Sequence, residues 1–190
     1  MVNHTRLDCA LGSASVMRSG VAQATWHTHH RTAFDSVLDQ QPLMSNVLAD
    51  LCVESEAATF AVMRLAATFD RPVICLDVLR AMGRSPESVE AFRSELDSAR
   101  GADRRYDDAL ERFDRELVDL DQLEHRARRL VETMALLLEG SLVLQHSPAV
   151  VADAFCASRL DGGAVARAAF GTLPSGLDTD AIVERHRPTI

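Results

Sequence analysis

The chain has 190 residues, of which 47% are hydrophobic and 25% charged, a balance that suits one globular domain with an ordinary core. All twenty basic residues are arginine, which excludes chemistry that needs a lysine amine, such as a Schiff base or a P-loop lysine. The formal net charge of -8 opposes nonspecific attraction to nucleic acid or an anionic membrane. With a single Trp and a single Tyr, the composition favours helices over an aromatic-rich sandwich.

The first predicted helix covers residues 5–29, because small apolar side chains return at steps of three and four: Ala10, Ala14, Met17, Val21 and Ala24. A second predicted helix begins at Pro42 and stops before Pro72, where a ring inside the helix would cost about 3 kcal/mol. Its apolar stripe comprises Met44, Leu48, Leu51, Ala58, Val62, Leu65 and Phe69.

Residues 31–42 join these two helices with side chains that neither helix needs. The guanidinium of Arg31 suits a phosphate or carboxylate, and Phe34 offers an apolar plate for a ring or acyl group. The linker is therefore a candidate ligand contact. The structural alternative stays open, because an Arg at a helix end commonly meets carbonyls or solvent and a Phe in a turn is commonly core.

The middle of the chain predicts further helices. A short apolar helix over 73–82 stops at Gly83, and a helix over 86–99 starts from a Ser-Pro-Glu sequence typical of an N-terminus. The next helix, from Asp103, carries its apolar stripe at Tyr106, Leu110, Phe113, Leu117 and Leu120. Asp121 with Glu124 forms an acidic version of a capping box that begins another helix.

That helix keeps the same spacing through Leu123, Ala127, Leu130, Met134, Leu137, Ser141 and Leu144, which is typical of antiparallel helices sharing a seam. Pro148 opens a shorter helix to about Leu160, closed by glycines at 162 and 163. The tail from Gly171 is expected to be loosely held around one short helix over 179–186. No strand pattern is evident.

Cys9, Cys52, Cys75 and Cys156 are far apart and form no CxxC pair, so we expect small buried residues in a reducing compartment, with a disulfide framework as the alternative. No signal peptide opens the chain, and no apolar run reaches the ~18 residues of a membrane span. These features predict a cytoplasmic protein without a membrane segment.

Four segments stand in the order 4–9 (HTRLDC), 31–34 (RTAF) with 41–44 (QPLM), 75–80 (CLDVLR) and 170–174 (FGTLP). Together they resemble the C-terminal helical domain of the acyl-CoA dehydrogenase superfamily, and most closely its alkylation-response, AidB-type branch. The resemblance implies an all-α antiparallel helical bundle. It divides the chain into the first two bundle helices over 1–71, an AidB-type helical extension over 73–174 and a tail over 175–190.

In that family FAD oxidises the bond between the α and β carbons of an acyl-CoA thioester. The resemblance implies that Arg31 contacts the pyrophosphate of FAD bound by a neighbouring subunit, that Phe34 packs near this cofactor, and that Arg6 lies near the acyl or flavin pocket. It also implies a homo-oligomer or pairing with an intact acyl-CoA dehydrogenase.

Three departures from the family limit this expectation. Asp35 stands where the family has glycine, a costly exchange if the backbone there has a positive φ. Only Arg71 and Pro72 stand where the family has a long segment with a candidate acidic base, and only Met1 precedes Val2. We therefore expect a truncated, internally deleted remnant without a catalytic residue of its own, whose first two helices keep exposed apolar stripes that favour association.

Other chemistry has weaker support. His27 and His30 share one helical face, but no acid or Cys completes a metal site, so a polar helix end is the alternative we favour. A Gly-x-Ser-x-Gly nucleophile motif is absent from the sequence. Between residues 83 and 132, ten Arg face fourteen acids, which makes DNA binding a distant third function behind a flavin-linked oxidoreductase role and a non-catalytic oligomerisation or interaction module.

Overall fold

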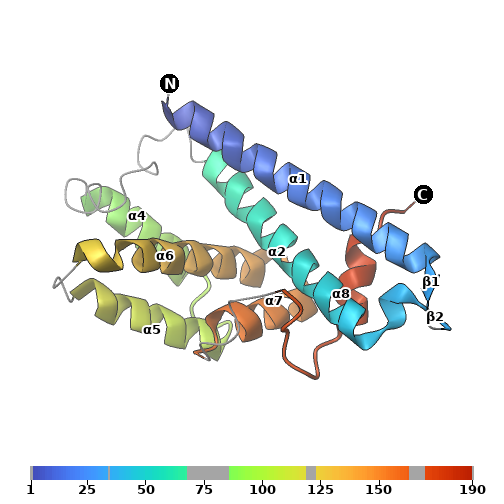
Figure 1. Cartoon of the computed structure of the whole chain (residues 1–190). Coiled ribbons are helices and arrows are strands. Elements are labelled where there is room, and N and C mark those ends of the chain that lie inside the picture. Colours follow the sequence, from blue (N-terminus) through green and yellow to red (C-terminus); the bar gives the residue numbers. More distant parts are fainter. Residues whose placement is uncertain (1, 34, 68–85, 119–122, 163–169, 190) are drawn as a thin grey trace.

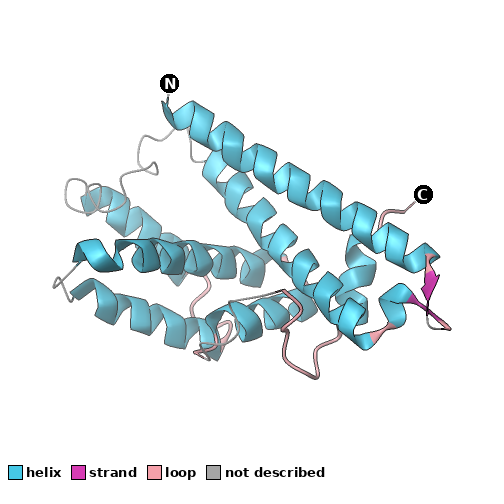
Figure 2. Cartoon of the chain, in the orientation of Figure 1, coloured by secondary structure: helices cyan, strands magenta, loops and turns pink. Residues whose placement is uncertain are grey.

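A computed structural model of the chain describes residues 2–33, 35–67, 86–118, 123–162 and 170–189, and these residues are almost entirely helical (Figures 1 and 2). The predicted all-α class is confirmed. The elements in chain order are α1 (Val2–His30), β1 (Thr32–Ala33), β2 (Ser36–Val37), the 3-10 turn η1 (Leu38–Gln40), α2 (Pro42–Ala67), α4 (Pro86–Asp97), α5 (Arg104–Val118), α6 (Leu123–His146), α7 (Ala149–Phe155), the π turn η2 (Cys156–Leu160) and α8 (Thr179–His186).

Helices α1 and α2 form a long antiparallel pair that crosses above the layer made by α4, α5, α6 and α7 (Figure 1). The inner face of α1 is made of small side chains, as its sequence predicts: Ala14 is 6% exposed, and Val21 and Ala24 pack against the core. Thr25 and Thr28 are also buried, with hydroxyls that donate to carbonyl oxygens one turn earlier, those of Val21 and Ala24. Small and self-satisfied side chains let α1 lie close to α2.

Helix α2 is the central element, because it contacts α1 on one side and α6, α7 and α8 on others. The predicted single stripe therefore describes only part of its buried surface. Leu48 of the stripe is buried, but so are Ala49, Cys52, Val53 and Ala57, and two acids, Asp50 and Glu56, are buried with them. A helix surrounded by neighbours buries polar positions too, and these must find partners.

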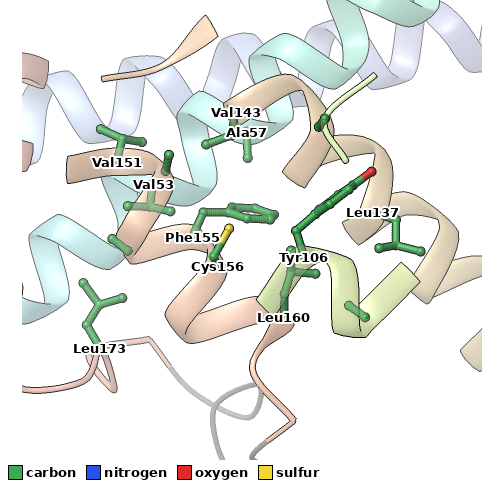
Figure 3. Close-up of a cluster of buried hydrophobic side chains, with 14 of the residues drawn as sticks. Val53, Ala57, Tyr106, Leu137, Val143, Val151, Phe155, Cys156, Leu160 and Leu173 are labelled. Atoms are coloured by element: carbon green, nitrogen blue, oxygen red, sulfur yellow. The ribbon is translucent and has the colours of Figure 1, made fainter. Parts of the chain in front are cut away.

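The hydrophobic core joins α2 to the second layer (Figure 3). Tyr106, Phe113, Leu137 and Phe155 are at most 1% exposed, and the Tyr106 hydroxyl donates a 2.8 Å hydrogen bond to the Leu96 carbonyl. The predicted seam of α5 with α6 is thus confirmed over the described residues.

Two predictions about elements lie outside the described residues, and three need correction. The short helix over 73–82 and the capping acid Asp121 fall outside them. The helix after Pro148 ends as a π turn from Cys156, and the linker contains two short strands, paired antiparallel, where no strand pattern is evident.

The predicted loose tail is wrong. Helix α8 forms at 179–186 as expected, but it packs on α2 with Ile182 0% and Val183 3% exposed. The Ser45 hydroxyl at the start of α2 donates a 2.7 Å hydrogen bond to Thr179 Oγ1. These buried side chains and this hydrogen bond contribute to holding α8 against α2.

The cysteine prediction holds for two of the three described thiols. Cys52 and Cys156 are buried and free, whereas Cys9 is free but exposed on α1, and Cys75 lies outside the described residues. Among the helices that the structure describes, none is both long and apolar enough to cross a membrane.

Candidate functional site

The linker between α1 and α2 forms a compact turn. Thr32 pairs with Val37 and Ala33 with Ser36, the Leu38 N–H donates to the Arg31 carbonyl at 2.9 Å, and the Gln41 side chain donates to the Ala33 carbonyl at 3.0 Å. Asp35 at its tip has a φ of 61°, and no other residue except glycine has a positive φ in the described part of the chain. The sequence hypothesis that this position needs a glycine-like backbone is correct.

Arg31 stands at the end of α1 with an exposed side chain, and no ion pair or hydrogen bond of its guanidinium is found among the described residues. Its backbone is held by the turn, while its charge meets no partner within the described part of the chain. Phe34 lies outside the described residues. The exposed carboxylate of Asp35 is the nearby feature that disfavours a phosphate.

Arg6 is exposed near the other end of α1. At 1.5 Å of rise per residue, the helix separates Arg6 from Arg31 by roughly 37 Å. One chain therefore does not bring the two predicted contacts together. Any site that used both arginines would have to use them at different ends of a ligand or in different subunits.

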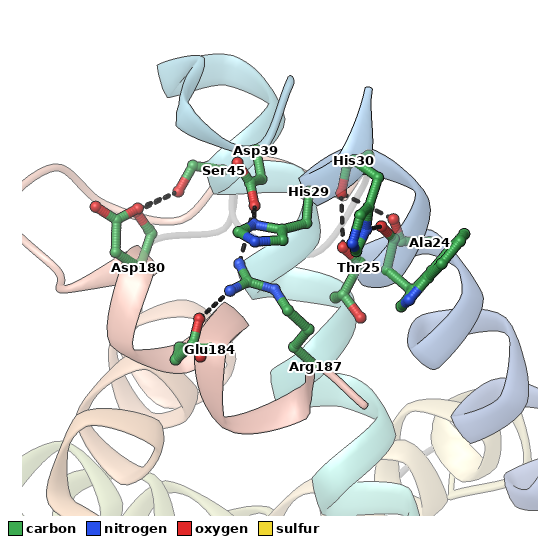
Figure 4. Close-up of polar contacts among 12 residues, drawn as sticks. Ala24, Thr25, His29, His30, Asp39, Ser45, Asp180, Glu184 and Arg187 are labelled. Carbon is green, nitrogen blue, oxygen red and sulfur yellow. Dashed lines mark hydrogen bonds and ion pairs between the residues drawn. The ribbon is translucent and has the colours of Figure 1, made fainter. Parts of the chain in front are cut away.

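The turn is fastened to α8 by a polar cluster that sequence reasoning missed (Figure 4). Asp39 of η1 is 7% exposed, and its Oδ2 accepts from His29 Nδ1 and from Arg187 Nη2, both at 2.9 Å. Arg187 also pairs with Glu184. No local sequence pattern predicts this contact, because Asp39 and Arg187 are far apart in the sequence and meet only when α8 packs on α2.

A second cluster surrounds the carboxylate of Glu56, which is 7% exposed in the middle of α2. It accepts from Ser147 Oγ at 2.7 Å, His186 Nε2 at 2.9 Å and Arg185 Nε at 3.0 Å. Burial alone would raise the pKa of Glu56, but these hydrogen bonds from His186, Arg185 and Ser147 lower it from 4.5 to about 2. We call this set the Glu56 clamp; it ties α8 and the α6–α7 connection to α2.

A third cluster holds the 170–174 segment against α2. The Gly171 N–H donates to Asp50 Oδ2 at 2.8 Å, and Asn46 exchanges two hydrogen bonds with the backbone of Leu173. Gly171 has a φ of 87°, and a Cβ there would lie 2.5 Å from Val47 Cγ2, so glycine is required. Segment 170–174 is therefore used for packing within the chain.

Asp50 belongs to a buried ion network. Arg159 is 8% exposed, and its Nη2 lies 2.6 Å from Asp50 Oδ1 and 3.1 Å from Glu54 Oε2. Burial, with a smaller contribution from Glu54, raises the pKa of Glu139 to about 7. One arginine thus lies among several acids, and its charge lowers the pKa of Glu139 by less than burial and Glu54 raise it.

The described residues offer neither a reactive thiol among the buried cysteines nor a cluster of metal ligands. Burial raises the pKa of both Cys52 and Cys156 to about 12, which keeps these thiols protonated and unreactive at neutral pH. No group of three or more His, Cys, Asp or Glu side chains with metal-binding geometry occurs among the described residues. His30 instead bonds the Trp26 carbonyl at 2.8 Å and stacks on the Trp26 ring at 4.4 Å.

Comparison with known proteins places these features in context. Residues 1–78 match the family model described as acyl-CoA dehydrogenase, C-terminal domain. The putative acyl-CoA dehydrogenase AidB of Escherichia coli (strain K12) is 24% identical over 221 residues, which cover 83% of this chain and 40% of that protein. The chain therefore spans less than half the length of this curated relative.

Proposed function

Because the chain belongs to the acyl-CoA dehydrogenase superfamily, and within it to the AidB-type branch, we propose that it is a helical module that presents Arg31 and Phe34 to an FAD held mainly by another chain. By itself it does not oxidise acyl-CoA. The partner is a second copy or an intact acyl-CoA dehydrogenase, which supplies most of the cofactor and substrate contacts.

The observation that carries this proposal is the state of Arg31. Its backbone is fixed by the hydrogen-bonded turn, while its side chain is exposed with no partner among the described residues. An arginine whose backbone is held in place and whose guanidinium meets no partner among the described residues is pre-organised for bidentate contact with a phosphate. A single arginine does not make a dinucleotide site, which is why the proposal requires a second chain.

The fit to FAD is partial. Asp35 keeps the left-handed backbone that suits the glycine of related proteins, yet it adds an exposed carboxylate four positions from Arg31. A carboxylate near a pyrophosphate costs binding free energy by like-charge repulsion. We derive no redox step in this chain, and we assign it no catalytic residue.

The aligned region also supports a shortened family member. It is 221 residues long, whereas this chain has 190 residues in all, so the relative carries residues within the matched region that have no counterpart here. This agrees with the short connection at 71–72, where the resemblance expects a long segment with an acidic base. A module lacking that acid depends on another chain for chemistry.

A second candidate function is a non-catalytic oligomerisation or interaction module. It is favoured by exposed apolar side chains on the first helix pair: Val16 is 73% exposed and Trp26 40% on α1, and Leu43 is 77% and Met63 59% on α2. Such positions favour association with a second apolar surface. DNA binding lacks comparable support, because Arg100, Arg104 and Arg105 each pair with nearby acids.

The flavin proposal is tested by absorbance and by complementation. The purified chain, incubated with FAD and desalted, should be colourless alone; mixed with an intact acyl-CoA dehydrogenase of the same organism, it should co-elute with the flavin. Arg31→Gln should weaken that flavin retention about tenfold, the loss of one charged hydrogen bond. Arg104→Gln is the control, since its side chain is 93% exposed and lies on α5. If the two proteins co-elute but Arg31→Gln retains as much flavin as the parent, the flavin contact is rejected and the interaction module stands as the function.

A further inference from the structure

A separate cleft of about 550 Å³ opens between α1, α2 and the end of α8. Figure 1 shows α8 and the C-terminal end of the chain beside these two helices. Arg18 of α1 lines the cleft and stands thirteen positions before Arg31, or about 20 Å along the helix. The volume falls within the range of roughly 300 to 1,000 Å³ typical of small-molecule sites.

The side chains that line the cleft carry a net positive charge, whereas the chain as a whole is negatively charged. Arg18, Arg185 and Arg187 line it together with a single carboxylate, that of Glu56, in a protein whose net charge is -8. Arg185 uses Nε and Nη2 on Glu56, and Arg187 is held by Asp39. The exposed side chain of Arg18 forms no hydrogen bond or ion pair among the residues that the structure describes.

His186 is the second side chain of the cleft that contacts Glu56. Its Nδ1 lies 2.8 Å from the Ile182 carbonyl oxygen and its Nε2 lies 2.9 Å from Glu56 Oε2. Glu56 is thus already bound by Arg185 and His186, whereas the charge of Arg18 has no such partner among the described residues.

Apolar and small polar side chains provide the rest of the wall. Val21, Ala22 and Phe60 line the cleft beside Ser55, Thr59 and Thr189. A shallower hollow of about 760 Å³ shares Ala22 and Pro188 with the cleft and continues along α1 to Trp26, whose side chain is 40% exposed. From Arg18, the apolar surface of Ala22, Pro188 and Trp26 thus continues from one hollow into the other.

We propose that this cleft binds a small amphipathic monocarboxylate, with its carboxylate on Arg18 and its apolar tail running over Ala22 toward Trp26. A monoanion is sufficient to match the charge of Arg18, because Arg185 is already paired with Glu56 and Arg187 with Asp39. The site is distinct from the flavin contact, since neither Arg31 nor any other residue of the turn lines the cleft.

Trp26 is the only tryptophan of the chain, so its fluorescence reports directly on the tail. Titration with hexanoate and octanoate should give saturable emission changes, and the affinity should rise by roughly tenfold for the two added methylene groups. Acetate, which has no tail to reach Trp26, should leave the emission unchanged. Hexanol, with the same tail and no charge, should bind more weakly than hexanoate. Inorganic phosphate should also bind more weakly.

Arg18→Gln should reduce the affinity for octanoate about tenfold or more, because one charged hydrogen bond is lost. Its exposed position predicts an unchanged melting temperature, and Arg104→Gln serves as the matched control on α5. No saturable binding of any carboxylate, equal binding of hexanol and hexanoate, or equal affinity of Arg18→Gln and the parent would each overturn the proposal. Calorimetric titration of the same series checks that fluorescence and heat report one event.

Discussion

Asp35 is the one residue other than glycine with a left-handed backbone in the described part of the chain. The left-handed φ of 61° costs most side chains about 1 to 2 kcal/mol, and Asp less. We expect Asp35→Gly to leave the free energy of unfolding within about 0.5 kcal/mol, since lost strain is offset by a more flexible unfolded chain. Asp35→Ala should destabilise by about 1 kcal/mol in urea unfolding. An equal effect of both substitutions would contradict the strained backbone.

Glu56 predicts a stability loss in acid. Its pKa is about 2 in the folded chain against an ordinary 4.5, so the folded state favours the ionised form. The stabilisation, about 3 kcal/mol, is complete above pH 4.5 and is lost as pH falls toward 2. Measured by urea unfolding, the free energy of unfolding of the parent should be larger than that of Glu56→Gln, and this difference should shrink steadily between about pH 5 and pH 2. A constant difference across that range would show that the clamp does not depend on the ionised carboxylate.

The contribution of Glu139 to stability depends on pH in the opposite direction. Its pKa is raised to about 7, so the folded state favours the protonated form and ionisation is a penalty that begins above pH 4.5 and is complete above pH 7. Glu139→Gln should therefore be more stable than the parent at about pH 8, by on the order of 2 kcal/mol, and similar at about pH 5. Glu132→Gln, at an exposed position on α6, is the matched control for the loss of one carboxylate from this helix. Thermal melting at both pH values measures the difference.

At the scale of elements, two helical glycines make a matched pair. A Cβ on Gly140 would lie 3.0 Å from Leu160 Cδ1 and 3.2 Å from Tyr106 Cδ2, where α6 meets η2 and α5, whereas one on Gly12 of α1 has no neighbour within 4 Å. Gly12→Ala should stabilise by up to about 1 kcal/mol through helix propensity. Gly140→Ala should lose that gain to overpacking and destabilise by roughly 1 to 2 kcal/mol. Stabilisation by both would mean that the α6 contact is loose.

Apolar periodicity was enough to predict the major described helices, because a helix that buries one face repeats its apolar side chains at steps of three and four. The same periodicity did not predict that Asp50 and Glu56 are buried, since their partners Gly171, Arg185 and His186 come more than a hundred positions later. The hold of α8 on α2 depends on these long-range contacts. The strands of the linker were missed because two residues are too few to show an alternating pattern.

The candidate site was predictable in part for a similar reason. Arg31 stands out in the local sequence of the linker, whereas the question of a glycine-like backbone at Asp35 came from the family resemblance; the structure places both at one turn. The Arg18 cleft depends on α1, α2 and α8 meeting, and no local pattern marks it. Local sequence thus predicts turns and stripes, whereas a cleft is a property of the assembled helices.

At the scale of the whole molecule, the α1–α2 pair remains incompletely covered. Helix α1 makes most of its contacts with α2, and the most exposed large apolar side chains of the pair are Leu43, Val16 and Met63. Burying a Val or Met side chain contributes about 1.5 to 3 kcal/mol, so a second apolar surface would gain several kcal/mol here. We therefore expect the purified chain to self-associate in the absence of a larger partner.

Light scattering coupled to size-exclusion chromatography measures this directly. The parent chain should elute as a dimer or larger species, and the double substitution Val16→Glu with Met63→Glu should weaken association by about 3 kcal/mol, or roughly a hundredfold in the dissociation constant. Val131→Glu is the control, because Val131 is 42% exposed but lies on α6 in the second layer. A parent chain that stays monomeric at every concentration would reject self-association, and an equal effect of the control would place the contact on another face.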